Sequence, residues 1–321
     1  ALCGLATLTR PEGLLLAVVI FVDIYRRVRP APAAIGLAAA LYLALVAPYG
    51  AFSLATTGHV LPTTFYAKAT GLGPWTLPNA LNYIKVLVFI GLLTNPAELV
   101  IAPAGALALW RAGGEARALV VWPVLLLIFQ ALLAPLYYHF GRYEMPLQPF
   151  FALWAAVGIE RFTRRAPTGS AWRAALPSLA LVLVGLFALN TWAGVYARSV
   201  FEIDHMQVAI AGWVKAHVPT GAPVALNDIG AITFIAGHPA VDVVGLVSPR
   251  FIALQRERPA GRAAQDVYAE VSREGARYLI IFPDWYPQLA AHAGLQRVYS
   301  VTIHNPIVVG APTMVVYALK R

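Results

Sequence analysis

The chain of 321 residues is short of charge. Only 12% of its residues are charged and 59% are hydrophobic, which gives a mean hydropathy of +0.67. Soluble domains carry about twice that share of charged residues. The scarcity of charge therefore excludes an ordinary soluble enzyme and predicts a polytopic membrane protein.

Cysteine is almost absent, because Cys3 is the only one in the sequence. One cysteine cannot form an intrachain disulfide, and it does not supply the paired thiolates of a zinc site. The sequence also lacks a glycine-rich nucleotide fingerprint, a His/Cys metal spacing and an internal repeat. We therefore predict no cofactor and no metal-ligating residues, and leave open whether a divalent metal ion is required.

Acidic residues are fewer than basic ones, 15 against 24, which gives a formal net charge of +9. Residues 1–198 hold 14 Lys/Arg against 6 Asp/Glu, whereas residues 199–321 hold 10 against 9. The excess thus belongs to the hydrophobic part, where arginines in short loops set the membrane topology and attract lipid phosphates. This distribution predicts a lipid bilayer as partner and no nucleic acid.

Hydrophobic runs divide the first 198 residues into expected membrane crossings. The run at residues 79–93 contains Asn82 and Lys85 and is expected to be interfacial or re-entrant. Loops rich in arginine alternate with loops that hold one cation each, Lys68 or Arg142, and arginine-rich loops stay cytoplasmic. We expect six crossings, at residues 1–24, 31–54, 98–110, 118–136, 145–159 and 174–196.

After Arg198 the composition becomes that of a soluble domain of about 120 residues. A helical pattern at residues 203–218 precedes five expected strands, with further helical patterns at residues 261–275 and 285–293. The strands are expected at residues 223–226, 240–244, 278–282, 298–303 and 313–319. The sequence thus predicts a polytopic α-helical membrane protein of about six transmembrane helices (residues 1–198) with a C-terminal extracytoplasmic α/β domain (residues 199–321), whose last two strands form an antiparallel edge.

Three groups of polar residues recur on the expected extracytoplasmic side of the membrane part. They are Arg10 with Glu12, Lys68 with Tyr66, and Arg142 with Tyr143 and His139. Cations that converge at a membrane surface suit a lipid-linked phosphate, because a buried anion must be paired and arginine can bind it through two hydrogen bonds. Such cations would also stabilise the phosphate that leaves during glycosyl transfer.

Two of these groups also have plainer interpretations. Pro11 interrupts the first hydrophobic run, so Arg10 lies either at a break that lines a polar cavity or at a turn where the chain reverses in water. The segment at residues 137–149 either serves a site or forms an aromatic belt in which Arg142 reaches the interface.

Several short segments resemble a known family. The segments LATLTRPEGLL (residues 5–15), LPTTFYAK (61–68) and GRYEMPLQP (141–149) resemble, in this order, recurring segments of bacterial GT-C superfamily membrane glycosyltransferases. The closest likeness is to protein-mannosyltransferase-like, aminoarabinose-transferase-like and terminal arabinofuranosyltransferase-like members. NDIGAI (227–232) and VDVVGLVSP (241–249) are similar to the external C-terminal domain of the arabinofuranosyltransferase-like group.

The resemblance implies an inverting transfer of a sugar from a polyprenyl-phosphate donor to a glycan, lipid or protein acceptor at the plasma membrane. It implies no nucleotide sugar and often no metal. In this reading Arg10, Lys68 and Arg142 contact the carrier phosphate, while Tyr66, Tyr143 and His139 help to position it.

The resemblance also implies a catalytic carboxylate, the general base, in the first extracytoplasmic loop, and no part of this sequence matches that loop. The chain begins with Ala1 and without an initiator Met, so we expect a fragment whose general base lies upstream of residue 1. Glu12 and Glu144 are the substitutes that chemistry allows. Asp228 either faces the acceptor or caps a helix or turn, and Asp242 has the same structural alternative.

Two functions of other classes stay open. A flippase or transporter of lipid-linked sugars would be expected to show internal repeats with broken helices, which are not evident. A membrane-anchored binding protein would use the C-terminal domain to hold a ligand and would leave the membrane cations unexplained.

Overall fold

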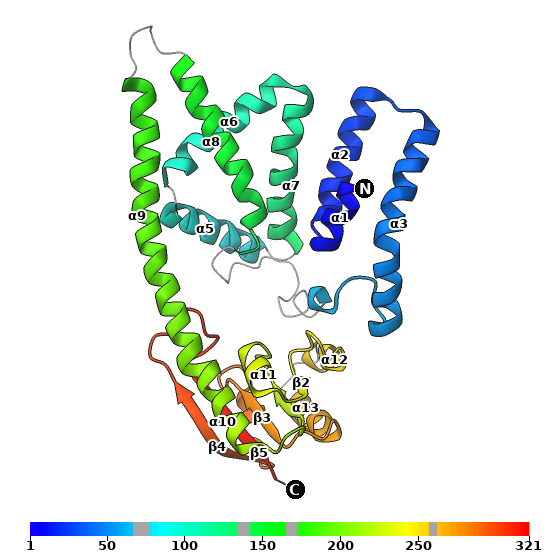
Figure 1. Ribbon diagram of the computed structural model, residues 1–321, viewed down its shortest axis with the longest axis vertical. Helices are drawn as coiled ribbons and strands as arrows, with labels where there is room; N and C mark the ends of the chain where they lie inside the picture. Colours follow the sequence, from blue (N-terminus) through cyan, green and yellow to red (C-terminus); the bar gives the residue numbers. More distant parts are fainter. Residues whose placement is uncertain (67–76, 95, 134–141, 165–171, 257–261, 321) are drawn as a thin grey trace. The chain divides into compact units, whose positions relative to one another are not determined.

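The computed structural model describes residues 1–66, 77–94, 96–133, 142–164, 172–256 and 262–320 (Figure 1). The chain forms two compact units. Unit 1 comprises Ala1–Leu61 and Pro74–Trp192, and unit 2 comprises Pro62–Gly73 and Ala193–Arg321.

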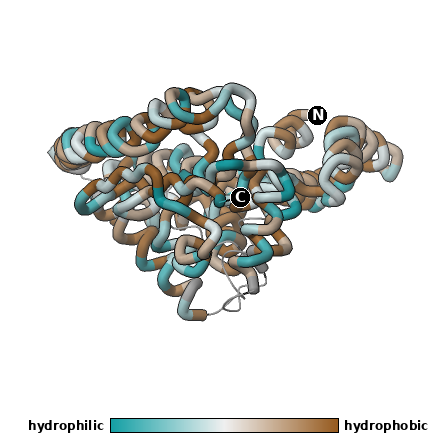
Figure 2. Tube along the Cα trace, turned by 90° about the horizontal axis from the view of Figure 1, so that it is seen from below, coloured by the Kyte–Doolittle hydropathy of each residue, from teal (hydrophilic) through white to brown (hydrophobic). Residues whose placement is uncertain are grey.

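Unit 1 is helical. Its elements are α1 (Leu2–Thr9), α2 (Gly13–Val28), α3 (Pro32–Thr57), α5 (Leu77–Thr94), α6 (Pro96–Ala112), η1 (Gly114–Arg117), α7 (Ala118–Leu133), η2 (Met145–Leu147), α8 (Gln148–Arg164) and most of α9 (Trp172–Ile203). Hydrophobic residues recur along the helices (Figure 2), and many large ones are exposed. Among the described residues, three helical segments are long and apolar enough to cross a membrane, Pro32–Thr57, Gly114–Leu132 and Ser178–His217. These features indicate that the protein associates with a membrane.

The first hydrophobic run folds as two helices that pack side by side, and not as one broken span. α1 ends at Thr9, and α2 begins at Gly13. A Cβ atom on Gly13 would lie 2.4 Å from the backbone carbon of Ala6, so only glycine allows the helices to approach this closely. The expectation that residues 1–24 form one crossing is therefore wrong, and of the two interpretations of Arg10 the structure has the turn.

Close backbone contact also joins α6 to α8. A Cβ atom on Gly105 would lie 1.7 Å from the carbonyl oxygen of Trp154, and one on Gly158 would lie 2.7 Å from that of Ile101. Small residues at helix crossings allow dense packing where no hydrophobic effect drives helices together. This contact fixes α8, and with it the segment that precedes α8.

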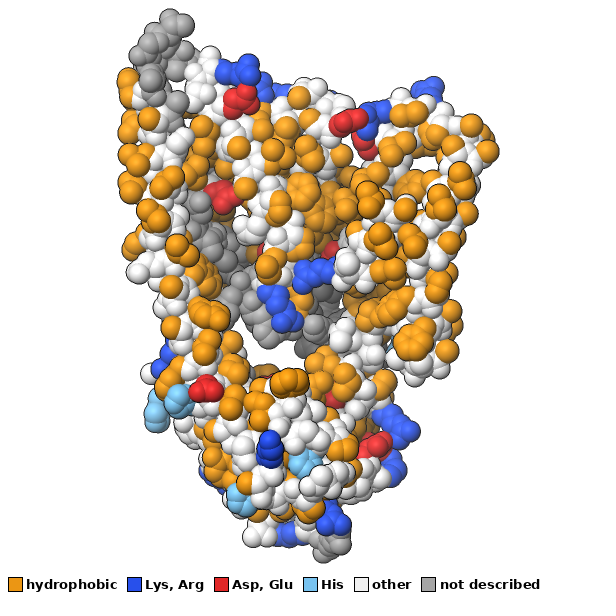
Figure 3. Space-filling view, in the orientation of Figure 1, with side chains coloured by type: hydrophobic (Ala, Val, Ile, Leu, Met, Phe, Trp, Pro, Cys, Tyr) orange, Lys and Arg blue, Asp and Glu red, His pale blue; other side chains and the backbone are white. Residues whose placement is uncertain are grey.

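The two ends of unit 1 differ in charge. Arg27, in the last turn of α2, pairs with Glu115 of η1 at 2.8 Å, so two of the arginine-rich segments lie at the same end. Lys and Arg side chains are visible along that end, at the top of Figure 3. At the other end, Leu147 of η2 is fully buried among Val19 of α2 and residues of α7, and this contact holds the segment after Arg142 in place.

Unit 2 contains a five-stranded sheet in the order β2-β1-β3-β5-β4. β1, β2 and β3 are parallel, and β5 is antiparallel to both β3 and β4. The predicted antiparallel pair of last strands is thus confirmed. The strands are β1 (Val224–Leu226), β2 (Ala240–Asp242), β3 (Tyr278–Ile281), β4 (Leu295–Thr302) and β5 (Thr313–Leu319).

Helices cover both faces of this sheet. Alternate residues of β5 face opposite sides, since Met314 and Val316 join one core and Val315 and Tyr317 the other. The first core lies under α10 (Ala209–His217) and α11 (Ala231–Ala236), and the second under α12 (Arg250–Arg256), α13 (Arg262–Arg273) and α14 (Pro287–Ala290). The result is a three-layer α/β domain.

The helix that enters unit 2 does not stop where the sequence predicts. We expected a membrane span that ends at Tyr196 and a separate helix from Ile203, but α9 continues through a π-helical turn, η3 (Asp204–Val208), into α10. Nothing in residues 197–202 breaks a helix, since the segment contains neither proline nor glycine. Unit 2 is therefore joined to a membrane-spanning candidate by uninterrupted helix.

Candidate functional site

The candidate site residues fall into three groups. Arg10, Glu12, Arg142, Tyr143 and Glu144 belong to unit 1, whereas Tyr66 and Asp228 belong to unit 2. Lys68 and His139 lie outside the described residues. The prediction that three cations share one pocket is therefore examined only at Arg10 and Arg142.

Glu144 is the centre of a buried polar cluster in unit 1. It precedes η2 and is 6% exposed. Its Oε1 lies 2.9 Å from the hydroxyl oxygen of Tyr83, in α5, which is hydrogen-bond distance. Its Oε2 is buried and has no hydrogen-bond partner among the described residues. A buried carboxylate with one free oxygen is uncommon, because leaving a charged group without partners is costly.

The bonds of Tyr83 require a proton on this cluster. The Tyr83 hydroxyl oxygen lies 2.6 Å from Oε1 of Gln130 and 2.9 Å from Oε1 of Glu144. The Gln130 amide is oriented by its Nε2, which donates to the carbonyl oxygen of Tyr143 at 3.0 Å. Tyr83 has one proton and faces two acceptors when Glu144 is ionised. Both bonds form only when Glu144 is protonated and donates to Tyr83, which then donates to Gln130.

The direction of the pKa shift of Glu144 agrees with a protonated side chain. Burial raises the pKa of Glu144, and the raised value persists although the Tyr83 hydrogen bond and the positive charge of Arg10 both lower it. That interaction also shows that the turn at Arg10 and the segment around Glu144 lie at the same end of unit 1. Arg10 is half-buried and makes no ion pair with any described residue. A protonated Glu144 leaves the charge of Arg10 unbalanced.

The other candidates of unit 1 are more exposed. Arg142 donates from Nη2 to the hydroxyl of its neighbour Tyr143 at 3.2 Å, and its guanidinium lies 5.2 Å from the centre of that ring. Glu12 begins α2, and its side chain makes no capping hydrogen bond. Glu144 thus differs from Glu12 by its burial and its proton-sharing partners.

The candidates of unit 2 do not form a comparable site. Tyr66 packs edge to face against Phe65, with ring centres 5.5 Å apart. Asp228 accepts a hydrogen bond from Nε2 of Gln207 at 2.9 Å, whereas α11 begins at Gly230 without a side-chain cap. The helix-cap alternative for Asp228 is therefore wrong.

Asp242 has the structural role that the sequence allowed. Its carboxylate accepts hydrogen bonds from the backbone N–H groups of Val244 at 2.9 Å and Val247 at 3.0 Å, and it is fully buried. These bonds set the turn after β2.

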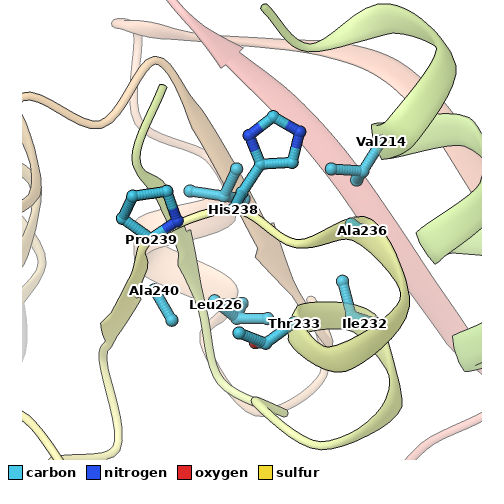
Figure 4. Close-up of a pocket in the computed structure, with 9 residues that line it drawn as sticks. Val214, Leu226, Ile232, Thr233, Ala236, His238, Pro239 and Ala240 are labelled. Atoms are coloured by element: carbon cyan, nitrogen blue, oxygen red, sulfur yellow. The ribbon is translucent and has the colours of Figure 1, made fainter. Parts of the chain in front are cut away.

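A small hollow in unit 2 lies between α10, α11 and the starts of β1 and β2 (Figure 4). Its polar members are Thr233, whose Oγ1 has no partner among the described residues, and His238, whose Nδ1 bonds with the carbonyl oxygen of Ala222 at 3.1 Å. The other lining residues are apolar, so the hollow offers no charged group for chemistry. Within the described ranges, no three His, Cys, Asp or Glu side chains are placed to hold a metal ion.

The sequence alone did not single out Tyr83 and Gln130. The available signal was Gln130, which is the one polar residue in the hydrophobic run at residues 118–136. A lone amide in such a run usually bonds to another helix. Nothing in the sequence indicated a buried hydrogen bond for Tyr83, because a tyrosine in a hydrophobic segment is also typical of an aromatic belt at the membrane interface.

One family model matches the chain. It describes a domain of unknown function, DUF8728, and matches residues 198–317. The match coincides with the sheet domain of unit 2 and leaves the helices of unit 1 uncovered. No curated protein matches the chain.

Proposed function

We propose that the protein transfers a sugar from a polyprenyl-phosphate carrier to an extracytoplasmic glycan, lipid or protein acceptor, with inversion at the anomeric carbon. In this proposal about six helices cross the plasma membrane, with α2 in place of residues 1–24 as the first, the arginine-rich loops are cytoplasmic, and unit 2 is extracytoplasmic. The observation that supports it is that the positive charge of Arg10 acts on buried Glu144 at the end of unit 1 opposite the paired Arg27 and Glu115, while Arg10 has no ion pair among the described residues.

Arg10 and Arg142 are assigned to the carrier phosphate. Arg10 has no counter-ion among the described residues, and Arg142 is exposed one turn before η2. A guanidinium binds a phosphate through two parallel hydrogen bonds and stabilises the negative charge that develops on it as the glycosidic bond breaks. Lys68, Tyr66, Tyr143 and His139 remain proposed contacts of the same phosphate.

Glu144 is assigned as the general base among the described residues. The hydroxyl oxygen of the acceptor attacks the anomeric carbon, while the bond from that carbon to the phosphate oxygen breaks and its electron pair leaves with the phosphate. The hydroxyl proton passes to Glu144, which acts as base only in the fraction of molecules in which it is ionised, because its pKa is raised. Because Tyr83 can turn from Glu144 to Gln130, the cluster accepts this proton and gains a hydrogen bond.

The test is transfer of a labelled sugar from synthetic polyprenyl-phosphate donors by the protein in nanodiscs. We expect Arg10→Ala and Arg142→Ala to lose roughly 100- to 1,000-fold in kcat/KM, which is the usual effect of removing one donor that stabilises transition-state charge. Arg10→Lys should recover part of the lost kcat/KM, because lysine keeps the positive charge but cannot form the two parallel hydrogen bonds of a guanidinium.

Arg161→Ala is the matched control, since it removes an exposed arginine from the last turn of α8. It should transfer sugar at the wild-type rate. Wild-type turnover by Arg142→Ala would contradict the assignment of that residue. Movement of the donor across the bilayer without product would favour the flippase instead.

A further inference from the structure

The loops of unit 2 divide into two edges of the sheet. β1, β2 and β3 run in parallel, and β4 runs in the same direction because both β3 and β4 are antiparallel to β5. The segments that follow these four strands therefore emerge at one edge, which we call the carboxyl edge. The segments that precede them lie at the opposite edge.

Large hydrophobic side chains are exposed at the carboxyl edge. Val247 after β2 is 60% exposed, Trp285 after β3 is 49% exposed and Ile307 after β4 is 45% exposed. Phe234 of α11, the helix that follows β1, is also exposed. In the described segments before the strands, 218–223, 237–239, 274–277 and 291–294, no large hydrophobic side chain is exposed. Clustered exposure of this kind marks an interaction surface.

The carboxyl edge is also the end at which α9 enters unit 2. Glu202, in the last turn of α9, accepts the N–H groups of Ile307 and Val308, each at 2.9 Å, in the segment after β4. In η3, Gln207 bonds to Asp228, two residues after β1. The helix then runs to His217 and leads to the start of β1, so it is antiparallel to that strand.

The helix that leads to this edge carries exposed hydrophobic residues upstream. The apolar segment Ser178–His217 includes most of α9, which exposes large hydrophobic side chains, among them Leu183, Leu186, Phe187 and Leu189. Tyr196 is 72% exposed, and exposed tyrosines near the end of a span mark the membrane interface. Six residues separate Tyr196 from Glu202, about 9 Å of helix. A lipid headgroup layer is about 5–7 Å thick, so a Tyr196 within that layer places Glu202 near its outer boundary.

We propose that the carboxyl edge of unit 2 lies in the headgroup layer of the bilayer, with Val247, Trp285 and Ile307 in contact with lipid. Trp285 suits this position, because its Nε1 donates to the carbonyl oxygen of Gly310 at 3.0 Å while much of its ring stays exposed. An indole with a satisfied N–H and an apolar ring is favoured at membrane interfaces. This proposal concerns a lipid surface and does not depend on glycosyl transfer.

Site-specific labelling of the full chain in phospholipid vesicles tests the proposal. Cys3→Ser provides a cysteine-free background, because Cys3 is the only cysteine. Val247→Cys and Ile307→Cys report the carboxyl edge, and Thr220→Cys and Ala291→Cys, both exposed, report the opposite edge. A nitroxide at each position is then exposed to oxygen, which concentrates in lipid, and to a water-soluble nickel chelate.

We expect the Val247→Cys and Ile307→Cys labels to collide with oxygen and to lose collisions with the nickel chelate, and the two control labels to show the reverse. Nickel collisions at all four positions would overturn the proposal, because the edge would then lie in water. Loss of collisions with both reagents at the carboxyl edge would overturn it as well, since protein and not lipid would then cover the edge.

Discussion

A buried glutamate in unit 1 and one in unit 2 have different hydrogen-bond partners. Glu202 of unit 2 is fully buried, and its carboxylate accepts the N–H groups of Ile307, Val308 and Val309 and a hydrogen bond from Arg198 at 2.9 Å. Glu144 of unit 1 has one hydrogen-bonded oxygen and one free oxygen among the described residues.

The two environments suit different roles: one carboxylate holds the structure together, and the other can exchange a proton. A carboxylate whose lone pairs are all used by backbone donors stays ionised and holds a loop in place. A buried carboxylate with a free oxygen and a raised pKa is typical of sites where protons are exchanged. The surroundings of Glu202 thus explain how α9 is fixed to unit 2, whereas those of Glu144 explain why we place chemistry in unit 1.

The largest expected effect on stability comes from Glu202→Ala. The change leaves three backbone N–H groups and Arg198 without their acceptor in a buried place, which costs about 3–5 kcal/mol. Unfolding of unit 2 by denaturant in detergent, followed by limited proteolysis, measures it. Glu274→Ala, also in unit 2, is the control, because its ion pair with Arg250 is exposed and is worth at most about 1 kcal/mol. Equal effects of the two changes would refute the structural role of Glu202.

Tyr83→Phe should have the next largest effect. It removes the hydroxyl that serves both Gln130 and Glu144 and leaves their buried oxygens unsatisfied, at a cost of about 1–3 kcal/mol. Thermal unfolding measures the loss. Tyr42→Phe is the matched control, since the Tyr42 hydroxyl bonds only to Thr7 in a partly buried place. A Tyr83→Phe variant as stable as wild type would show that the cluster does not hold unit 1 together.

Glu144→Gln should change stability in a manner that depends on pH. Burial raises the pKa of Glu144 in the folded protein, so the folded state binds the proton more tightly than the unfolded chain does. This stability is complete below the ordinary pKa of a glutamate and is lost as the pH rises through the raised pKa. The amide does not titrate, so the variant should gain stability relative to wild type as the pH rises.

Thermal unfolding at several pH values tests this prediction. Each unit of pKa shift corresponds to about 1.4 kcal/mol. A constant difference between Glu144→Gln and wild type from acid to neutral pH would contradict a raised pKa.

Arg142→Ala should have the smallest effect on stability, within about 0.5 kcal/mol, because the side chain is exposed and its contacts with described residues are those with Tyr143. Sugar transfer should nevertheless be lost. Parallel measurement of the melting temperature and of turnover checks this separation, and a large loss of stability would give Arg142 a structural role instead.

The central strands of unit 2 were predictable because each is a short run of consecutive apolar residues, buried on both faces of the sheet. β5 and β3 lie within one residue of the expected ranges, since apolar residues in those segments are bounded by polar or turn-forming ones. α11 and α12 were missed. They have six and seven residues, which is too short for a helical period to stand out from a loop.

The site was less predictable than the fold. Arg10 and Glu144 were candidates because of their residue types and flanking segments. The sequence does not indicate, however, that the turn at residue 10 and the segment at residue 144 lie at the same end of unit 1. Tyr83, Gln130 and Gln207 contribute through contacts between distant elements. Sequence spacing gives such contacts only where both partners share one helix or strand.

The titration of Glu144 itself is the most direct measurement. Infrared difference spectra of the full protein, recorded between acid and neutral pH, report the C=O stretch of protonated carboxyls, and Glu144→Gln identifies the band that belongs to Glu144. We predict a band that is absent from the variant and is lost at a pH above about 4.3, the ordinary pKa of a glutamate. A Glu144 band that is lost at or below that ordinary value would contradict the protonated cluster, and with it the unbalanced charge of Arg10.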